Sequence, residues 1–294
     1  MTKIYTPPPY IERFQYKPCQ QVNDPVTRKR VYLTPDGESL PSVTTILSAT
    51  KDTTHLEEWK KRVGEEKARQ ITTEAAGVGT GLHANLERFL CGMTRQPGNN
   101  PVHIKANAMA DVIIQNGLKD VDEVWAMEQS LYFPGLYSGT TDLVCVYKGN
   151  PCIADYKQTN KPKKAEWVED YYLQLMAYTL AHNEVYGTDI REGHIFMVSR
   201  GNDGMKPGGE VYQQFDLLPQ DFNKYQDMSY RKGVSPSQEQ REKISETLKG
   251  NIPWNKGKTG TGFGNPNTNP MRNPESIAKM LATRKANKEK KLFS

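Results

Sequence analysis

The stretch between residues 124 and 156 constrains the fold most, because it combines strand-favouring side chains with closely spaced turns. Three of its segments are rich in β-branched and aromatic residues, at 124–133, 140–147 and 151–156. Gly149-Asn150-Pro151 separates the last two segments, as is typical of a turn between antiparallel strands. We therefore expect consecutive strands that pair in one sheet.

Helical sequence lies on both sides of these strands. The expected helices span 41–47, 56–70, 81–90, 103–116, 167–186 and 219–230, and further strands span 193–198 and 210–217. Ser42 is the expected N-cap of the first helix, and Gly77-Val78-Gly79-Thr80 the expected flexible link before the third. Residues 1–40 form an irregular lead-in with a short hairpin that turns at Pro35-Asp36-Gly37. The order of elements predicts a mixed α/β (α+β) domain over 41–230.

Charge is distributed unevenly along the chain. Residues 231–294 carry 14 Lys and Arg against 5 Asp and Glu, a net +9, whereas residues 1–230 carry 25 against 29, a net −4. An acidic body with a basic end is typical of a carboxylate-rich enzyme joined to a nucleic-acid-binding arm. A merely solvated basic end is the alternative.

The basic end has a repeat. Its middle, 260–274, is rich in Gly, Asn, Thr and Pro and cannot build a core. Two helical stretches around it match at an offset of 36 residues, in the pairs Glu239/Glu275, Lys243/Lys279, Thr247/Thr283 and Lys249/Lys285. This pattern predicts a small, extended helical tail over 234–294 with two degenerate repeats. Chance similarity between two lysine-rich helices is the alternative.

Several classes of protein do not fit this composition. The four cysteines are scattered without a CxxC pair, which favours reduced thiols over a zinc or iron–sulfur site. No apolar run approaches the ~18 residues that cross a bilayer, and the first 18 residues lack the apolar segment of a secretory signal. We expect a cytoplasmic protein with no membrane partner and no small-molecule cofactor.

Two aspartates and a lysine form the candidate catalytic group. Asp155 and Lys157 lie two residues apart on one expected strand, so both project to the same face. Asp142 lies on the preceding strand and can approach Asp155 across the hairpin. Paired carboxylates suit Mg²⁺ or Mn²⁺, and a neighbouring lysine can orient a water and offset charge on a phosphate. Because D-x-K is common, a surface salt-bridge cluster is the alternative.

Further motifs accompany this group in a fixed order. Gln174 and Tyr178 lie one turn apart on a helix, and His83 and Glu87 do so on an earlier one. The order G-T-x-x-H, G-x-x-D, D-x-K, Q-x-x-x-Y resembles the RecB-like branch of the PD-(D/E)XK nucleases. The preceding P-S-V-T-T-I-L looks like the mitochondrial genome maintenance exonuclease group and related phage exonucleases.

This resemblance covers about residues 30–220 and implies a restriction-endonuclease-like mixed sheet flanked by helices. It implies His83, Asp142 and Asp155 as metal ligands, and Lys157 as the group that activates water. Gln174 and Tyr178 would position these groups or the DNA, and Glu128 could add an outer carboxylate. No cysteine follows Cys152, so the iron–sulfur cluster of some relatives is not expected.

The tail resembles the small modular repeats of phage homing endonucleases, most clearly at Trp254-Asn255-Lys256-Gly257-Lys258. By this resemblance the tail binds DNA, with basic side chains on phosphates and Trp254 on a sugar or base. Trp254 could equally be the anchor of a minimal fold. The expected DNA-binding residues are Lys243, Lys249, Trp254, Asn255, Lys256, Lys258, Lys279 and Lys285.

The leading hypothesis is Mg²⁺- or Mn²⁺-dependent hydrolysis of DNA by a phage-encoded exonuclease that acts on single-stranded or frayed ends. A site-selective homing endonuclease is the first alternative, because such tail modules accompany those enzymes. A DNA-binding protein with an inactive nuclease-like body is the second, and RNA also fits as a substrate.

Overall fold

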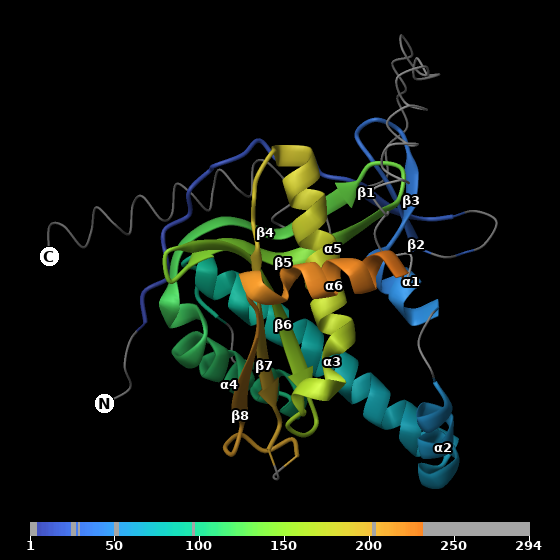
Figure 1. The fold of residues 1–294 in the computed structure, drawn as a ribbon. Helices are drawn as coiled ribbons and strands as arrows, with labels where there is room; N and C mark the ends of the chain where they lie inside the picture. Colours follow the sequence, from blue (N-terminus) through green and yellow to red (C-terminus); the bar gives the residue numbers. More distant parts are fainter. Residues whose placement is uncertain are drawn as a thin grey trace, which may run out of the picture.

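The computed structural model describes residues 5–24, 28, 30–49, 53–95, 98–201 and 204–231. Its centre is a five-stranded sheet in the order β4-β5-β6-β7-β8 (Figure 1). The strands are β4 (Val121–Phe133), β5 (Tyr137–Tyr147), β6 (Asn150–Thr159), β7 (Glu192–Ser199) and β8 (Val211–Leu217). Only β6 and β7 pair in parallel, and the other neighbours in this sheet are antiparallel. The sheet is therefore mixed, as expected.

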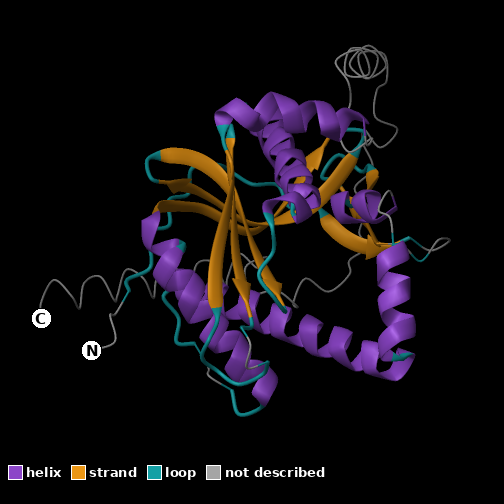
Figure 2. Ribbon diagram, turned by 60° about the horizontal axis from the view of Figure 1, so that its bottom comes forward, coloured by secondary structure: helices purple, strands orange, loops and turns teal. Residues whose placement is uncertain are grey.

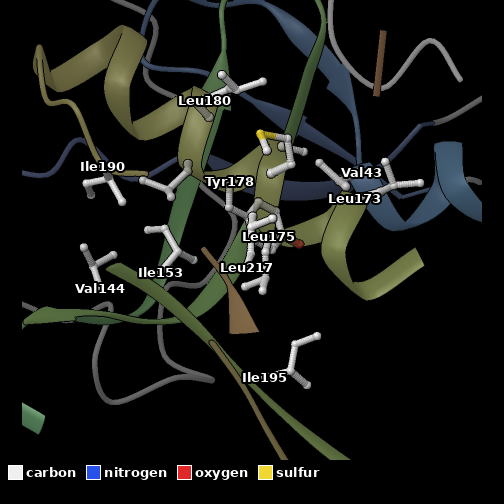
Figure 3. Close-up of a cluster of buried hydrophobic side chains, with 14 of the residues drawn as sticks. Val43, Val144, Ile153, Leu173, Leu175, Tyr178, Leu180, Ile190, Ile195 and Leu217 are labelled. Carbon is white, nitrogen blue, oxygen red and sulfur yellow. The ribbon is translucent and has the colours of Figure 1, made fainter. Parts of the chain in front are cut away.

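Helices cover both faces of this sheet. The helices α3 (Glu65–Leu90) and α4 (Pro101–Asn116) lie on one face, and α5 (Glu169–Tyr186) packs on the other with α1 (Val43–Ala49) and α6 (Pro219–Arg231) (Figure 1). Figure 3 shows the core on the α5 side, which includes Val144 and Ile153 of the sheet and Leu173 and Leu175 of α5. This arrangement confirms the predicted mixed sheet flanked by helices.

Side chains alternate along β6 between the two cores. Ile153 belongs to the α5 side, whereas Cys152 and Ala154 belong to the side of α3 and α4. This alternation of period two directs Asp155 and Lys157 toward α5. The sequence pattern thus predicts correctly that the two side chains share a face.

The helix α3 corrects one prediction. It runs without interruption through Gly77-Val78-Gly79-Thr80, which is therefore not a flexible link. A Cβ on Gly77 would lie 3.0 Å from Val102 Cγ1, and one on Gly81 would lie 2.8 Å from Ala106 Cβ. These glycines allow α4 to approach α3 closely. The chain instead breaks at Gly64, whose φ is +83°, between α2 (Thr54–Val63) and α3, so that the two helices meet at a corner away from the sheet (Figure 2).

The N-terminal residues contain more regular structure than expected. The predicted hairpin forms between β2 (Arg30–Leu33) and β3 (Ser39–Pro41), and β1 (Gln20–Asn23) adds a strand that the sequence did not predict. Ser42 Oγ accepts a hydrogen bond of 3.1 Å from the Thr45 N–H, which confirms it as the N-cap of α1.

Two short 3₁₀ turns complete the described elements, η1 (Leu118–Asp120) and η2 (Ala165–Trp167). Within the described part of the chain, no helix is both long and apolar enough to cross a membrane. The predicted tail, 234–294, lies outside the described residues, so its repeats and its expected DNA-binding residues stay predictions. The boundaries at 41 and 230 likewise stay predictions.

Candidate active site

The site opens where β5 and β6 stop pairing. Their ladder ends at the pair Leu143 and Ala154, and Asp142 and Asp155 are the next residues beyond it. Here the Asp142 carboxylate replaces the ladder, since its Oδ2 accepts a hydrogen bond of 2.6 Å from the Tyr156 N–H. The two strands thus separate at the level of both aspartates.

A third carboxylate, that of Glu128, faces Asp142. In the β4–β5 ladder Met127 pairs with Leu143 and Gln129 with Thr141, so Glu128 lies opposite Asp142. Like charges in such a position destabilise a sheet. Glu128 also has a φ of +46°, a left-handed conformation that a non-glycine residue adopts at a cost. Both features indicate that this strand position is not selected for stability.

His83 of α3 lies between these two carboxylates. Its Nδ1 is 3.4 Å from Asp142 Oδ1 and 3.6 Å from Glu128 Oε1. The potential ligand atoms of the three residues all lie within 4.8 Å of one another. We call this group the carboxylate–histidine cluster.

The electrostatics of the cluster reflect its excess of negative charge. Burial would lower the pKa of His83, but the charges and hydrogen bonds of Asp142 and Glu128 outweigh burial and raise it well above its usual value. Burial would raise the pKa of Asp142, yet His83 and then Lys157 lower it. Burial, and then the charge of Glu128, raises the pKa of Glu87 to about 7. The two carboxylates therefore favour the charged form of the His83 imidazole.

A chain of polar contacts surrounds Asp155 beside this cluster. The Lys157 ammonium pairs with Asp155 Oδ2, and Gln174 Nε2 donates to Asp155 Oδ1 at 3.3 Å and to the Tyr178 hydroxyl at 3.3 Å. Burial raises the pKa of Asp155 to about 6, with Lys157 lowering it and Asp142 raising it further. A side chain of α5 thus holds the Asp155 carboxylate.

Gly139 allows Tyr178 to reach this position. A Cβ on Gly139 would lie 2.7 Å from Tyr178 Cε1, closer than real Cβ contacts, so the ring lies directly on the β5 backbone. The glycine of G-x-x-D therefore has a packing role that links it to Q-x-x-x-Y.

The structure brings together all six residues that the sequence singled out for chemistry, in two adjoining groups. His83 and Asp142 join Glu128 in the cluster, whereas Asp155 contacts Lys157 and Gln174 instead. Glu128, which the sequence suggested only as an outer carboxylate, lies within this cluster. Counting residues back in pairs from the turn at Gly135 would have aligned it with Asp142, because the ladder there keeps one register.

These residues fit a hard divalent cation. Carboxylate oxygens with one imidazole nitrogen are donors that Mg²⁺ or Mn²⁺ accept in proteins. Asp155 Oδ2 is buried, and the Lys157 ammonium is the partner that the described residues give it. A buried carboxylate oxygen in this state has capacity for a further positive partner.

Comparisons with known proteins find relatives that are named exonucleases. The chain is similar to mitochondrial genome maintenance exonuclease 1. It is 29% identical to the human protein over 197 residues, which is 63% of this chain and 56% of that protein. It is 27% identical to the Xenopus tropicalis protein over 204 residues, 64% of this chain and 55% of that protein. The chain thus spans about half the length of the curated relatives it matches.

Two further matches are a sequence motif near the C-terminus and a solved structure. A NUMOD3 motif matches residues 235–262, which hold the first predicted tail repeat and confirm the resemblance of the tail to a modular motif. Among solved structures, a candidate exonuclease from Eubacterium rectale matches with a TM-score of 0.39 and 11% identity, covering 65% of this chain and 77% of that one.

Proposed function

We propose that this chain is a divalent-metal-dependent deoxyribonuclease, and that it acts as an exonuclease on single-stranded or frayed DNA ends. The observation that carries the proposal is the carboxylate–histidine cluster directly beside the Asp155–Lys157 pair. A purely structural salt-bridge cluster would have equal numbers of acidic and basic groups. Here three carboxylates, those of Glu128, Asp142 and Asp155, face one imidazole and one ammonium group. Similarity to exonuclease-named relatives supports the same reaction class.

Each residue has a role in this proposal. His83, Asp142 and Asp155 would hold the metal, as the family resemblance implies, and Glu128 would be a further ligand because it lies in one cluster with His83 and Asp142. When bound, the ion would act as a Lewis acid on the scissile phosphate and lower the pKa of a water. Lys157 would orient the attacking water and offset charge that develops on the phosphate. Gln174 and Tyr178 would hold Asp155 in position through their hydrogen bonds.

A second candidate is a site-selective homing endonuclease, which the NUMOD3 motif favours. Linear and circular DNA, each single- and double-stranded, distinguish the two when incubated with and without Mg²⁺. An exonuclease degrades only the linear forms, whereas an endonuclease also opens the circles. Absence of cleavage of any form would favour the third candidate, an inactive DNA-binding protein, and RNA run in parallel tests the substrate class.

We also propose that the tail supplies general DNA affinity through Lys243, Lys249, Trp254, Asn255, Lys256, Lys258, Lys279 and Lys285. The charge difference between the tail and the acidic body supports this division. Each phosphate neutralised on duplex DNA contributes about −0.9 to the slope of log K against log salt. If the tail contacts roughly four phosphates, truncation after Gly233 flattens that slope by about 3–4. An unchanged slope would assign duplex affinity to the body.

The composition further favours a cytoplasmic location for this activity.

A further inference from the structure

The connection between β6 and α5 is a basic segment in an otherwise acidic body. Residues 160–168 contain Lys161, Lys163 and Lys164 against a single acidic residue, Glu166. The segment directly follows the strand that carries Asp155 and Lys157, and it lies between β6 and α5 in Figure 1. We call it the β6–α5 loop. Positive charge in this position favours a polyanion next to the candidate active site.

The loop is held in one conformation by its backbone. Thr159 Oγ1 donates to the Lys161 carbonyl at 2.7 Å. The Gln213 side chain of β8 accepts from the Lys163 N–H at 2.7 Å and donates to the Lys163 carbonyl at 2.8 Å. Val168 closes the loop as a fully buried side chain. The lysine side chains are therefore presented from a rigid base, which reduces the entropy lost on binding.

Tyr171 connects the loop to the candidate active site. Its ring centroid lies 5.2 Å from Lys157 Nζ and 5.2 Å from Lys163 Nζ. One aromatic ring in the first turn of α5 thus lies against both the lysine of D-x-K and a lysine of the loop. A nucleic-acid strand that ran from Asp155 past Tyr171 to Lys163 would meet a positive charge at Lys157 and again at Lys163.

Trp167 lies at the far end of this path. It is 57% exposed, more than any other large hydrophobic side chain in the described part of the chain. Lys164 Nζ lies 5.4 Å from the ring, so a cation and an accessible π-face are offered together. Basic groups that follow a backbone, combined with rings on which bases stack, are characteristic of single-strand binding. A duplex does not offer an unstacked base to such a ring.

We propose that the β6–α5 loop is a binding site for single-stranded nucleic acid, in which Lys161, Lys163 and Lys164 bind phosphates and Trp167 stacks on a base. This rests on the proposed function for its link to catalysis, because it describes how a strand is led to Asp155. It also assigns part of the affinity for single strands to the body rather than to the tail.

The test compares binding of a single strand and a duplex by the full chain. All proteins carry Asp155→Asn so that the probe stays intact, and the probe is a fluorescein-labelled oligothymidine of about 12 nucleotides or its duplex with oligoadenosine. Trp167→Ala should weaken single-strand binding roughly tenfold, within the range of one stacked base, and change duplex binding less than about twofold. Trp167→Phe should restore most of the loss.

The lysines are tested by their salt dependence. The triple variant Lys161→Gln, Lys163→Gln, Lys164→Gln should flatten the slope of log K against log salt by about 2 for the single strand, at about 0.7 per phosphate. Lys148→Gln is the matched control. The Lys148 side chain is 62% exposed, close to the 68% of Lys164, and its Nζ lies 5.1 Å from the Tyr147 centroid, but it lies at the opposite end of β6. This control should leave the slope unchanged.

The outcomes separate this site from the nuclease proposal. In the active chain, Trp167→Ala should raise KM for a single strand about tenfold with kcat within about threefold. Unchanged Kd and KM in the Trp167 and lysine variants, with wild-type melting temperatures, would overturn the site even if the wild type cleaves DNA. Conversely, weaker single-strand binding in the Trp167 and lysine variants, beside a wild type that binds but cleaves nothing, would support the site and reject the nuclease function.

Discussion

Two groups of buried charges in this molecule differ in how completely they are satisfied. Lys105 of α4 is fully buried, and its Nζ donates to the Arg200 carbonyl at 2.7 Å, the Lys206 carbonyl at 2.8 Å and Glu210 Oε1 at 2.7 Å. The Gly208 N–H adds a hydrogen bond of 2.9 Å to Glu210 Oε2. All three ammonium protons have acceptors, so this group fixes the β7–β8 loop on α4.

The candidate active site is the opposite case. Glu128 and Asp142 face each other across a ladder, and Asp155 Oδ2 lies buried against the Lys157 ammonium. Buried charges cost stability unless they are paired and hydrogen-bonded. Lys105 has a full set of acceptors, whereas the candidate active site has more carboxylates than cations. We infer that this excess of negative charge serves binding or catalysis. The difference between the two groups can be tested residue by residue.

The largest expected effect is on cleavage by Asp155→Asn. Because a carboxylate ligand is lost, we expect Mg²⁺-dependent cleavage to fall by roughly 10³-fold or more, while circular dichroism and the melting temperature report an intact fold. Initial rates on a labelled single strand at saturating Mg²⁺ measure the loss. Activity within about tenfold of wild type would remove Asp155 from the metal site.

Lys105→Met should show the reverse pattern. Removing one partner of a buried ion pair leaves Glu210 uncompensated, at a cost of about 3–5 kcal/mol in the free energy of unfolding. Urea denaturation followed by fluorescence measures this loss. The kcat of the molecules that remain folded should stay within about threefold of wild type. A variant as stable as wild type but inactive would mean that the Lys105 group serves the site.

The sequence predicts the residues of the active site better than those of the structural group. Alternation along a strand is enough to bring Asp155 and Lys157 to one face, and helical spacing is enough for Gln174 and Tyr178. Glu128 needs the register of the β4–β5 ladder, which the turn at Gly135 determines only once the strands are known to pair. Local patterns therefore predict which side chains share a face of one helix or strand. They do not predict which residues of two paired strands lie opposite each other.

Lys105 and the glycines of α3 illustrate what local patterns cannot predict. The acceptors of Lys105 are two carbonyls and a carboxylate from a loop about a hundred positions away in the chain. Gly77 lies in the expected flexible link and Gly81 directly after it, yet their close approach to Val102 and Ala106 shows that tertiary packing uses the missing Cβ. In each case the deciding partner is distant in sequence.

Lys157→Ala is expected to have an intermediate effect. The Lys157 ammonium pairs with Asp155 and does not belong to the carboxylate–histidine cluster, so its loss should leave metal binding possible. Turnover should fall on the order of 10²-fold, as for other positioned catalytic groups. Binding of the single strand in Ca²⁺ should weaken less than about threefold. Loss of binding with normal turnover would make Lys157 a phosphate contact only.

The smallest expected effect is on stability in the presence of metal, and it compares the two groups directly. A ligand that binds only the folded state stabilises it by RT ln(1 + [L]/Kd), about 1.4 kcal/mol at ten times Kd. We expect Mg²⁺ or Mn²⁺ to raise the free energy of unfolding of the wild type by this amount, and EDTA to reverse the gain. Asp142→Asn removes a cluster carboxylate and should abolish the gain. Lys105→Met leaves the cluster intact. Metal should therefore raise its free energy of unfolding by the same amount as in the wild type, although that free energy is lower to begin with. An equal gain in Asp142→Asn would mean that the ion binds elsewhere, and the carboxylate excess would then need another explanation.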